Sequence, residues 1–589
     1  MKPLTLSFVC IMYDTMFMSK ESYMQHKWWM ESVGYQIYPK SFFDANSDGI
    51  GDLQGIIRQL DYLEGLGVNL LWICPFYDSP MDDNGYDVRN FFDVSKEFGT
   101  MDDVHELIQK AHERGIKIVL DFVLNHTSDE HPWFIESRKS KDNPYRDYYI
   151  WHDGKMVDGN KVEPTNWGSF FGGSAWQYDE PTDSYYMKIF SKKMPDLNWK
   201  NESVQQEMVN IAKTWLDMGV DGFRIDAVSH LDRAPFEDAI SDGTEKYPLD
   251  WFKFSNLPKV HDYLKMLNEN VFKPYDCVAI GEVGGSASID SGLLYSGFDS
   301  HELSMVFNFD HNWCNNLHET LNTKKLKTDV LALKRVFSSW QYAFESKGWL
   351  PLNWLNHDQP RLASQYGDYK YPLASLKMLA TALHFMRGTP FIYQGEEIGM
   401  TNFPFEDVDQ FNDVSSIANY QYHLNKEPDD PVKALKKAAQ RSRDNARTAM
   451  QWANEPYGGF SSVEPVPLVN PNYRKINVEN QVHDPSSLFN HYRKLIDLRR
   501  HSAYHDVITF GSYEMLDEND QDHYVYLRRF QDDVLLVINS FSRKPTRYDL
   551  SSYEIIECVI TNMKRYQIKK NYIYLKPYES VVFKVKENL

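Results

Sequence analysis

Residues 117–126 read KIVLDFVLNH, and residues 221–228 read DGFRIDAV. Both stretches are nearly continuous runs of apolar residues, and polar side chains stand within them or directly after them. Such runs are typical of parallel strands that are covered on both faces, because a half-exposed strand would alternate between apolar and polar residues. Polar groups at the C-terminal ends of such strands mark the edge where α/β barrels carry their sites.

The same pattern recurs along the chain, and helical stretches separate the runs. Residues 102–115, for example, carry an apolar helical stripe and end on Gly115, a good helix stop. Eight strand–helix alternations predict an α/β protein with a (β/α)8 barrel (TIM barrel). A doubly wound open sheet is the alternative, but no G-x-G-x-x-G turn follows the first strand. The other predicted strands are residues 33–39, 69–77, 277–283, 305–311, 351–357 and 389–397.

Segments outside this alternation predict further structural units. The polar stretch after the third strand is far longer than an ordinary connecting loop, which indicates a small subdomain over the barrel mouth. A second long excursion, residues 398–450, follows the eighth strand. From about residue 510 short strands alternate with turns, which predicts an antiparallel β domain. The predicted units are an N-terminal extension (1–29), the barrel (30–125 and 197–509), the inserted subdomain (126–196) and the C-terminal β domain (510–589).

Composition excludes several classes of partner. The chain has 589 residues and a net charge of −20, without the basic footprint that a nucleic-acid-binding protein needs. The same charge disfavours anionic membranes, and no run of about 20 apolar residues predicts a membrane span. Residues 1–20 lack a basic cluster and an A-x-A cleavage site, so a disordered extension is favoured over a signal peptide.

Cysteine usage bears on the cellular compartment. The count is odd, and no C-x-x-C or Cys/His cluster occurs. Free thiols in a reducing cytoplasm are the simplest account, so the sequence predicts a cytoplasmic protein. The five cysteines are Cys10, Cys74, Cys277, Cys314 and Cys558.

Two carboxylates at predicted strand ends suggest a reaction. Asp226 lies in an otherwise apolar strand two residues after Arg224, and a nearby guanidinium would hold this carboxylate ionised. Glu282 follows the apolar run AIG, so its side chain would enter the barrel mouth. An ionised Asp beside a Glu in a drier setting is the arrangement that glycoside hydrolysis uses. A single Asp at a strand end is more often a helix cap or a loop ligand. Other polar residues at the same edge are Asp121, Asn125, His126, His357 and Asp358.

Several motifs, in order, carry a resemblance to a known family. They are QIYPKSFFDANSDGIGDLQGI, GYDV, DFVLNH, MPDLNW, GFRIDAV, GEV, NHDQPR and RDNARTAMQW. The chain resembles the α-amylase superfamily, glycoside hydrolase family 13, over about residues 30–589. The resemblance is strongest to the oligo-1,6-glucosidase and α-glucosidase branch.

The resemblance implies a role for each residue of the reaction centre. Asp226 would be the nucleophile that forms a covalent glucosyl–enzyme, and Glu282 would be the general acid and base. Retention of configuration places two such carboxyl groups about 5–5.5 Å apart. Asp358 would be the third acid, and Arg224 would orient Asp226. His126 and His357 resemble the histidines that hydrogen-bond glucose hydroxyls.

The resemblance also implies a closed end to the site. Asp87, in NGYDV, would close the non-reducing end together with Arg447 from RDNAR, which would make the enzyme exo-acting. Arg443, one helical turn away, is an alternative partner, and a purely structural salt bridge is another interpretation of the pair.

The segment DANSDGIGD carries oxygen donors at every second position, with Gly49 allowing a sharp turn. This pattern suits a hard cation, and the twelfth position is Gly55 rather than the Glu of an EF-hand. It resembles the single structural Ca²⁺ loop of oligo-1,6-glucosidase-type enzymes. The predicted ligands are Asp44, Asn46, Asp48, the carbonyl of Ile50, and Asp52.

Bond preference depends on departures from the family pattern. Members specific for α-1,6 bonds usually carry Val after the nucleophile, and this chain has Ala227, so maltose and short malto-oligosaccharides are the first expected substrates. Transglycosylation could accompany hydrolysis. The alternative is an oligo-1,6-glucosidase acting on isomaltose-type bonds. Met194 departs from the QPDLN pattern of that branch. No RLDRD-type loop occurs, which disfavours sucrose isomerisation.

Two further questions stay open at this level. Four aromatic residues of the inserted segment could shape the acceptor side of the site or fill the subdomain core. They are Trp167, Phe170, Phe171 and Trp176. A non-catalytic glucosidase-like binding protein is a remote alternative, disfavoured because all three acids are present and no membrane anchor is seen.

Overall fold

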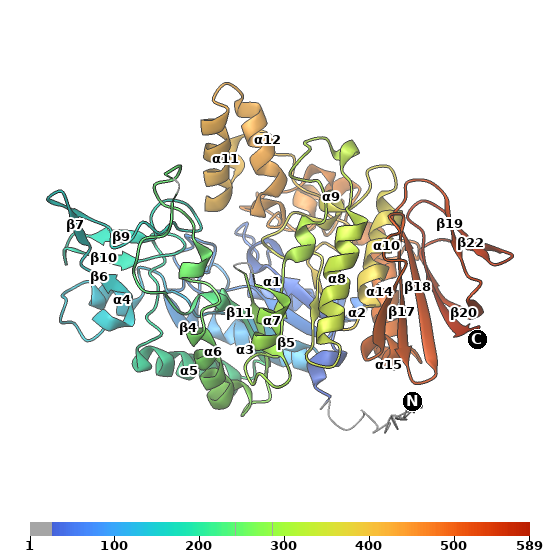
Figure 1. Ribbon diagram of the computed structural model, residues 1–589, viewed down its shortest axis with the longest axis horizontal. Coiled ribbons are helices and arrows are strands. Elements are labelled where there is room, and N and C mark those ends of the chain that lie inside the picture. The colour runs from blue at the N-terminus through green and yellow to red at the C-terminus, as the bar shows by residue number, and fades with distance from the viewer. Residues whose placement is uncertain (1–25, 242, 285–286, 589) are drawn as a thin grey trace, which may run out of the picture.

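The central sheet consists of eight short parallel strands whose side chains are buried on nearly every position. The computed structural model describes residues 26–241, 243–284 and 287–588, so the extension predicted for residues 1–20 lies outside the described residues. The strand order is β13-β12-β11-β5-β2-β1-β15-β14, and the two end strands contact each other (Figure 1). The predicted (β/α)8 barrel is therefore confirmed. Its strands are β1 (Gly34–Ile37), β2 (Leu70–Ile73), β5 (Lys117–Val123), β11 (Gly222–Asp226), β12 (Val278–Glu282), β13 (Met305–Phe307), β14 (Pro351–Leu352) and β15 (Thr389–Tyr393).

The barrel strands are apolar on both faces because each face packs against a different core. On β2, Leu70 and Trp72 belong to the inner cluster, and Leu71 and Ile73 belong to the outer cluster beneath the helices. Burial of apolar surface on both faces stabilises the sheet at roughly 25 cal/mol per Å² removed from water. The seventh strand is shorter than predicted, because the chain leaves the sheet after Leu352 and residues 353–358 turn into the barrel mouth.

Helices surround the barrel (Figure 1); α1 to α10 lie between its strands in sequence, and α11 to α15 follow its last strand. The first turn of α3 is fixed by a capping box in which Thr100 and Asp103 each bond the other's backbone N–H. The helices are α1 (Leu53–Arg58), α2 (Leu60–Leu66), α3 (Met101–Glu113), α4 (Pro132–Ser137), α5 (Glu202–Asp217), α6 (Lys259–Leu267), α7 (Ile289–Ser296), α8 (Val330–Phe344), α9 (Leu362–Gln365), α10 (Pro372–His384), α11 (Val414–Lys426), α12 (Pro431–Arg441), α13 (Val478–Val482), α14 (Leu488–His501) and α15 (His505–Thr509).

Two insertions rise around the barrel mouth. Between β5 and β11 lies a small antiparallel sheet with its own core, in which Trp167 and Trp176 are buried. After β15, α11 and α12 form a helical hairpin that projects at the top of Figure 1. The strands outside the barrel in this half of the chain are β3 (Tyr77–Asp78), β4 (Asn90–Val94), β6 (Trp151–His152), β7 (Lys155–Val157), β8 (Asn160–Val162), β9 (Trp176–Asp179) and β10 (Ser184–Met187).

The C-terminal part is antiparallel, as predicted, and consists of a five-stranded and a three-stranded sheet. It packs on α8 and α10 of the barrel. Arg528, from the second C-terminal strand, crosses the junction and donates to the Phe385 carbonyl. Arg499 of α14 donates to the neighbouring carbonyls of His384 (2.8 Å) and Gly388. The strands are β16 (Ser512–Leu516), β17 (His523–Phe530), β18 (Asp533–Ser540), β19 (Thr546–Asp549), β20 (Tyr553–Thr561), β21 (Gln567–Lys569), β22 (Tyr572–Leu575) and β23 (Ser580–Glu587).

Two observations concern the membrane and the thiols. Within the described part of the chain, no helix combines the length and the apolar character that a bilayer span requires. The four described cysteines are free; Cys74, Cys277 and Cys314 are buried and Cys558 is half-buried.

Trp29, assigned to the extension by the sequence, is buried and joins the inner barrel cluster.

Candidate active site

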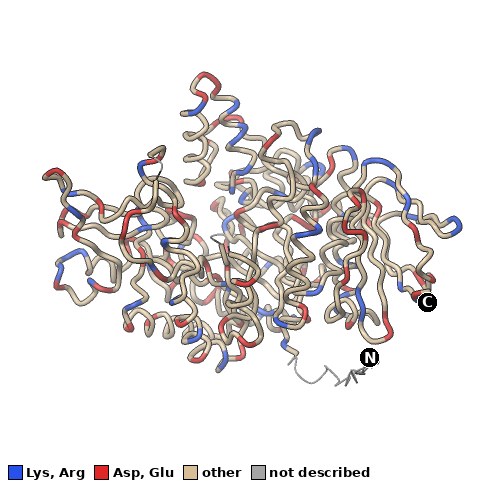
Figure 2. The backbone as a smooth tube through the Cα atoms, in the orientation of Figure 1, with Lys and Arg blue, Asp and Glu red and all other residues tan. Residues whose placement is uncertain are grey.

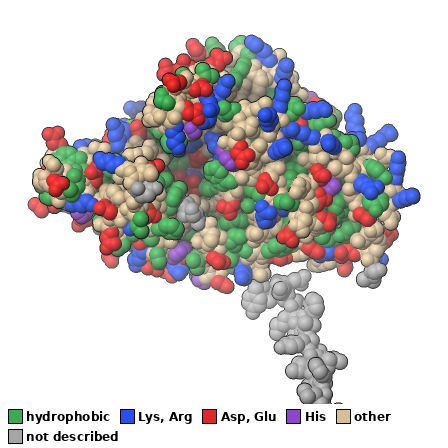
Figure 3. Space-filling view, turned by 45° about the horizontal axis from the view of Figure 1, so that its top comes forward, with side chains coloured by type: hydrophobic (Ala, Val, Ile, Leu, Met, Phe, Trp, Pro, Cys, Tyr) green, Lys and Arg blue, Asp and Glu red, His purple; other side chains and the backbone are tan. Residues whose placement is uncertain are grey.

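A cavity of about 700 Å³ opens at the C-terminal ends of the barrel strands. Figure 3 shows it as a hollow below the α11–α12 hairpin, with acidic and histidine side chains inside it. Five of the eight predicted catalytic and substrate-binding residues line it: Asp226, Glu282, Asp358, His126 and His357. The parallel strands bring these residues together because their C-terminal ends meet at one edge of the barrel.

Arg224 connects the acidic groups at the bottom of the cavity. It lies on β11, is fully buried, and pairs in register with Asp121 on β5. Its Nη1 donates to Asp121 (2.5 Å) and Asp226 (2.9 Å), and its Nη2 donates to Glu282. The Trp72 indole also donates to Asp121 (2.8 Å). A single guanidinium thus holds Asp226 and Glu282 side by side, as the sequence predicted for Arg224 and Asp226.

The two carboxyl groups on Arg224 differ from ordinary acids in their protonation. Burial raises the pKa of Asp226 well above its ordinary value, with Arg224 opposing the rise and Glu282 adding to it. Burial likewise raises the pKa of Glu282, and a hydrogen bond links the pair. The pKa of Asp226 is therefore raised, whereas the sequence predicted that the guanidinium of Arg224 would hold this carboxylate ionised; burial outweighs the arginine. The closeness of the two carboxyl groups also disfavours the state in which both are ionised. One member can therefore act as an acid while the other is ionised.

The two predicted histidines are buried and neutral. Burial lowers the pKa of both His126 and His357 to about 3. The Gln36 amide donates to Nδ1 of His357 (2.8 Å), so the ring proton is on Nε2, which lies 2.7 Å from the Tyr86 hydroxyl and 3.2 Å from Asp358. This tautomer makes His357 a hydrogen-bond donor within the cavity.

Asp358 is held ionised by its neighbours. Although burial opposes the effect, His357, Arg443 and Arg447 lower the pKa of Asp358 well below its usual range. Because His357 is neutral at pH 7, the two arginines supply this effect there: Arg447 Nη2 lies 2.8 Å from Asp358, and Arg443 Nη1 lies 3.3 Å away. A permanently charged carboxylate can bind sugar hydroxyls through two acceptor oxygens.

The predicted Asp87–Arg447 pair is wrong, and a different pair occupies that side of the cavity. Asp87 is fully buried behind the lining and accepts hydrogen bonds from the Ser79 hydroxyl (3.0 Å) and the backbone N–H of Asp83 (3.1 Å). Its carboxylate thereby organises the turn that presents Asp83 to the cavity. Asp83 contacts Arg443 Nη2 (3.0 Å), and both residues line the cavity. Arg443 is the residue that the sequence left open as the alternative partner.

The aromatic residues of the inserted segment divide into two groups. Phe170 and Phe171 line the cavity, whereas Trp167 and Trp176 are core residues of the small subdomain. Ala227 and Met194 also line the cavity, so both departures from the family pattern lie where a substrate would contact them. Ala227 adopts a left-handed backbone conformation (φ 47°), which turns the chain sharply after Asp226.

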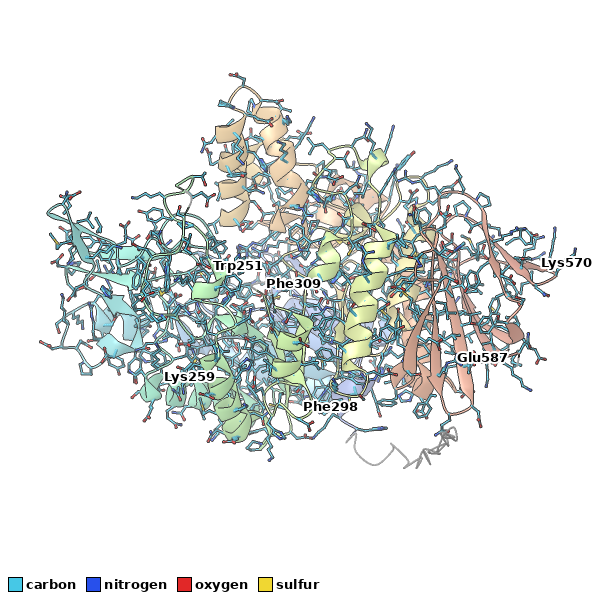
Figure 4. The ribbon with its side chains drawn as sticks, viewed as in Figure 1. Trp251, Lys259, Phe298, Phe309, Lys570 and Glu587 are labelled. Atoms are coloured by element: carbon cyan, nitrogen blue, oxygen red, sulfur yellow. The ribbon has the colours of Figure 1, made fainter. Side chains whose placement is uncertain are left out.

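Sequence reasoning missed several lining residues. Trp251 and Phe309, labelled in Figure 4, line the cavity together with Trp313. Trp251 belongs to a short 3-10 helix, and Phe309 and Trp313 follow β13. Aromatic residues in irregular segments carry no periodic signal, so only their tertiary placement reveals them. Asp83 lies directly before the quoted NGYDV motif, but spacing alone does not distinguish it from Asp87.

The predicted ion loop offers oxygen donors in a short segment. Asp44 and Asp52 are buried and accept hydrogen bonds from backbone N–H groups of the loop and of the start of α1. Asn46 and Asp48 are exposed, and the Asn46 amide donates to Asp48 (3.1 Å). Oxygen donors of this kind fit a hard cation. No three His, Cys, Asp or Glu side chains of the described ranges are grouped as a metal site, so a cation at this loop, with Ile50 as carbonyl ligand, stays a prediction.

Comparison with known families identifies the protein family to which the chain belongs. The family model for the alpha amylase catalytic domain matches residues 36–509. The chain belongs to the α-amylase family, glycoside hydrolase family 13. A second model, for the SusG alpha-amylase C-terminal domain, matches residues 524–582. The protein is a glycoside hydrolase, as the sequence predicted.

Relatives of this α-amylase-family enzyme cover nearly its whole length. An oligo-1,6-glucosidase of Bacillus cereus is 45% identical over 572 residues, which are 96% of this chain and 100% of that protein. An alpha-glucosidase of Pediococcus pentosaceus is 42% identical, covering 95% of this chain and 99% of that protein. The crystal structure of trehalose-6-phosphate hydrolase from Bacillus licheniformis has a TM-score of 0.86 at 40% identity, covering 95% of this chain and 100% of that chain.

Proposed function

We propose that this enzyme removes terminal glucose units from short α-gluco-oligosaccharides with retention of configuration. The proposal rests on one observation: Asp226 and Glu282 share Arg224 and line the same cavity. Asp226 attacks the anomeric carbon while Glu282 gives its proton to the leaving glycosidic oxygen. The resulting β-linked glucosyl ester is then hydrolysed by water, whose proton Glu282 accepts.

Each of the other polar groups has a part in holding the sugar. The charged Asp358 accepts hydrogen bonds from ring hydroxyls, and His126 and His357 bind hydroxyls as neutral groups. Arg224 sets the proton distribution of the carboxyl pair rather than touching the sugar, because it is fully buried beneath them. Charged acceptors and donors fixed before the substrate arrives stabilise the transition state without reorganisation.

We infer exo-action from the wall formed by Asp83 and Arg443. Arg443 is anchored from behind by Asp413, which is fully buried and accepts its Nε–H (2.8 Å). Arg443 therefore contacts three carboxylates, those of Asp83, Asp358 and Asp413. A fixed ion pair at the end of the cavity leaves room for one sugar before the scissile bond.

The proposed bond is the α-1,6 bond of isomaltose-type sugars. This assignment is supported by several relatives named oligo-1,6-glucosidase that are 44–46% identical and span nearly the whole chain. It replaces maltose as the first expected substrate, because relatives that align over the full length outweigh the single Ala227 position.

A second candidate, α-1,4 hydrolysis of maltose and short malto-oligosaccharides, is favoured by a specific observation. Ala227 lines the cavity directly after the proposed nucleophile, where a small side chain leaves more room for an aglycone. One relative of similar length is named alpha-glucosidase. Initial rates on maltose and isomaltose at equal concentration decide between the two bonds, and the released glucose is α in its first moments if configuration is retained.

Two further proposals concern stability and location. We propose that residues 44–52 bind a structural Ca²⁺ through Asp44, Asn46, Asp48, Ile50 and Asp52, since these supply only hard oxygen donors. A cytoplasmic location is supported by the four described free thiols.

The decisive experiment replaces each acid with alanine and supplies azide with an aryl α-glucoside. Loss of either acid should lower turnover by about 100-fold to 10,000-fold or more. In Glu282→Ala, azide attacks the glucosyl ester and yields α-glucosyl azide. In Asp226→Ala, azide takes the place of the nucleophile and yields β-glucosyl azide. Near-normal activity in either folded variant, or the same azide product from both, would contradict the assignments.

A further inference from the structure

The active-site cavity is lined by an exposed tryptophan that the proposed reaction does not use. Trp313 follows β13, lines the cavity and is 63% exposed, although tryptophan side chains are on average well buried. The reaction centre lies deeper, since only 14% of the Asp226 side chain and 23% of the Glu282 side chain are exposed. Trp313 therefore lies near the mouth of the cavity rather than beside the scissile bond.

The Trp313 ring is held in place from one side. The guanidinium of Arg441 lies over it, 4.3 Å from the ring centre, and this cation–π contact stabilises one orientation of the indole. Arg441 is the last residue of α12, the basic helix that blue segments mark in the upper hairpin of Figure 2. Its Nε and Nη2 atoms are shielded from solvent, so the guanidinium is fixed behind the ring. Because Arg441 covers one face of the indole and most of the residue is exposed, the opposite face is open.

The backbone that carries Trp313 is fixed as well. It forms a short 3-10 helix that ends at Trp313. At its start, the Asp310 carboxylate accepts the indole N–H of Trp340 from α8 (3.0 Å). The next residue, His311, is buried, and its Nε2 lies 3.2 Å from the Trp354 carbonyl. A ring held by its backbone and by a stacked cation loses little conformational entropy when a ligand binds to it.

The substrate chain extends from the closed end of the cavity toward the mouth. In the proposed function the wall of Asp83 and Arg443 closes the cavity beyond the terminal glucose, so every further unit lies on the open side. A disaccharide has one such unit, and a trisaccharide has a second unit farther from the scissile bond. The cavity volume of about 700 Å³ is well within the range of sites that hold drug-sized ligands, so there is room beyond a single glucose.

We propose that Trp313 is a specificity-determining residue whose open face binds the outer glucose unit, so that the enzyme favours chains of three or more units over disaccharides. The C–H face of a pyranose ring packs on an aromatic ring while its hydroxyls stay in water. Trp251 and Phe309, half-buried and labelled in Figure 4, line the cavity and are available to the inner units. Arg441 acts through Trp313 and is a positioning residue. The inference rests on the proposed function, which sets the direction of the chain.

Kinetics on substrates of increasing length test this platform. The wild-type enzyme and Trp313→Leu are compared on an aryl α-glucoside, isomaltose and isomaltotriose, or on maltose and maltotriose if the α-1,4 bond is the one cleaved. Leucine keeps an apolar side chain but removes the ring. We expect kcat/KM for the trisaccharide to fall about threefold to tenfold through KM, because the outer unit is bound equally in the ground and transition states. The values for the disaccharide and the aryl glucoside should stay within about twofold.

Phe252→Leu is the matched control, since Phe252 is 81% exposed, adjoins Trp251 and lies outside the cavity lining. It also removes an exposed ring and should leave the rates on all three substrates unchanged. Trp313→Phe keeps a ring and should retain most of the preference for the trisaccharide. An equal loss on all three substrates, an unchanged rate on the trisaccharide, or the same loss in Phe252→Leu overturns the proposal.

Calorimetric titration of Glu282→Gln separates this proposal from the proposed function, because it measures binding without turnover. We expect the trisaccharide to bind about threefold to tenfold more tightly than the disaccharide, and Trp313→Leu in the same background to remove the difference. Equal affinities overturn the platform even if the wild-type enzyme hydrolyses glucosides. The expected affinities without any hydrolysis by the wild-type enzyme contradict the proposed function and support the platform.

Discussion

Replacement of Asp83 by Asn tests the closed end of the active site. The Asp83 side chain is only 7% exposed and contacts Arg443 at 3.0 Å. Asn has nearly the same shape but no charge. Arg443 keeps its contacts to Asp413 and Asp358, so the substitution leaves no buried cation unpaired. We therefore expect a stability loss of only about 1–2 kcal/mol.

The effect on substrate should be larger than the effect on folding. A hydrogen bond from a sugar hydroxyl to a charged group contributes about 1.5–3 kcal/mol. Its loss corresponds to a fall in kcat/KM of roughly 10-fold to 150-fold. Since the hydroxyl is bound in both the ground state and the transition state, much of the fall should appear in KM.

The assay measures kcat and KM for an aryl α-glucoside and for isomaltose. Asp82→Asn is the matched control, because Asp82 precedes Asp83, bonds the Ser191 hydroxyl (2.6 Å) and lies outside the cavity lining. It should retain activity within about twofold. An Asp83→Asn enzyme with unchanged kcat/KM would refute the assignment of the wall to Asp83 and Arg443.

Three other changes have defined outcomes. Burial raises the pKa of Glu396 from 4.5 to about 8, so the folded state loses at most about 5 kcal/mol of stability as the pH rises across this range, and Glu396→Gln should remove that loss. Melting temperatures of both proteins from pH 5 to 9 test this, and the same pH dependence in both would contradict it. Ala227→Val adds two methyl groups to the cavity and should raise the ratio of kcat/KM for isomaltose to that for maltose about tenfold; it should also destabilise the fold somewhat, because the backbone is left-handed there. An unchanged ratio would show that this position does not determine which bond is cleaved. Chelation should lower the melting temperature and added Ca²⁺ should restore it, whereas Asp48→Asn should weaken the response; a metal-free protein with unchanged melting argues against the ion.

The predictable part of the fold and site follows from strand burial. Continuous apolar runs predicted the barrel, because both faces of each strand pack against a core. The ends of those strands then had to meet, which brought Asp226 and Glu282 together with Arg224 between them. The antiparallel C-terminal strands were predictable from a different signal, the alternation of short strands with turns.

The unpredictable part depends on turns and irregular segments. The segment DDNGYDV contains three acidic residues, and the turn that it forms decides which of them faces the cavity. The carboxylate of Asp87 accepts hydrogen bonds from the loop itself, whereas that of Asp83 faces the cavity. Phe309 and Trp313 follow a strand of only three residues, so no repeating pattern marks them. Arg443 and Asp413 are 30 positions apart in sequence and are brought together by the helical hairpin between them. Sequence spacing alone does not predict this contact.

The junction of the barrel and the C-terminal sheets bears on how the enzyme can be engineered. Arg499 and Arg528 satisfy carbonyls at the end of α10, immediately before β15 begins. Because Arg528 lies on β17, deleting the C-terminal sheets would remove its hydrogen bond to the Phe385 carbonyl, a few residues before the eighth barrel strand. A chain shortened in this way should therefore have a less stable barrel. Tags or fusion partners are better attached where they leave the hydrogen bonds of Arg499 and Arg528 intact.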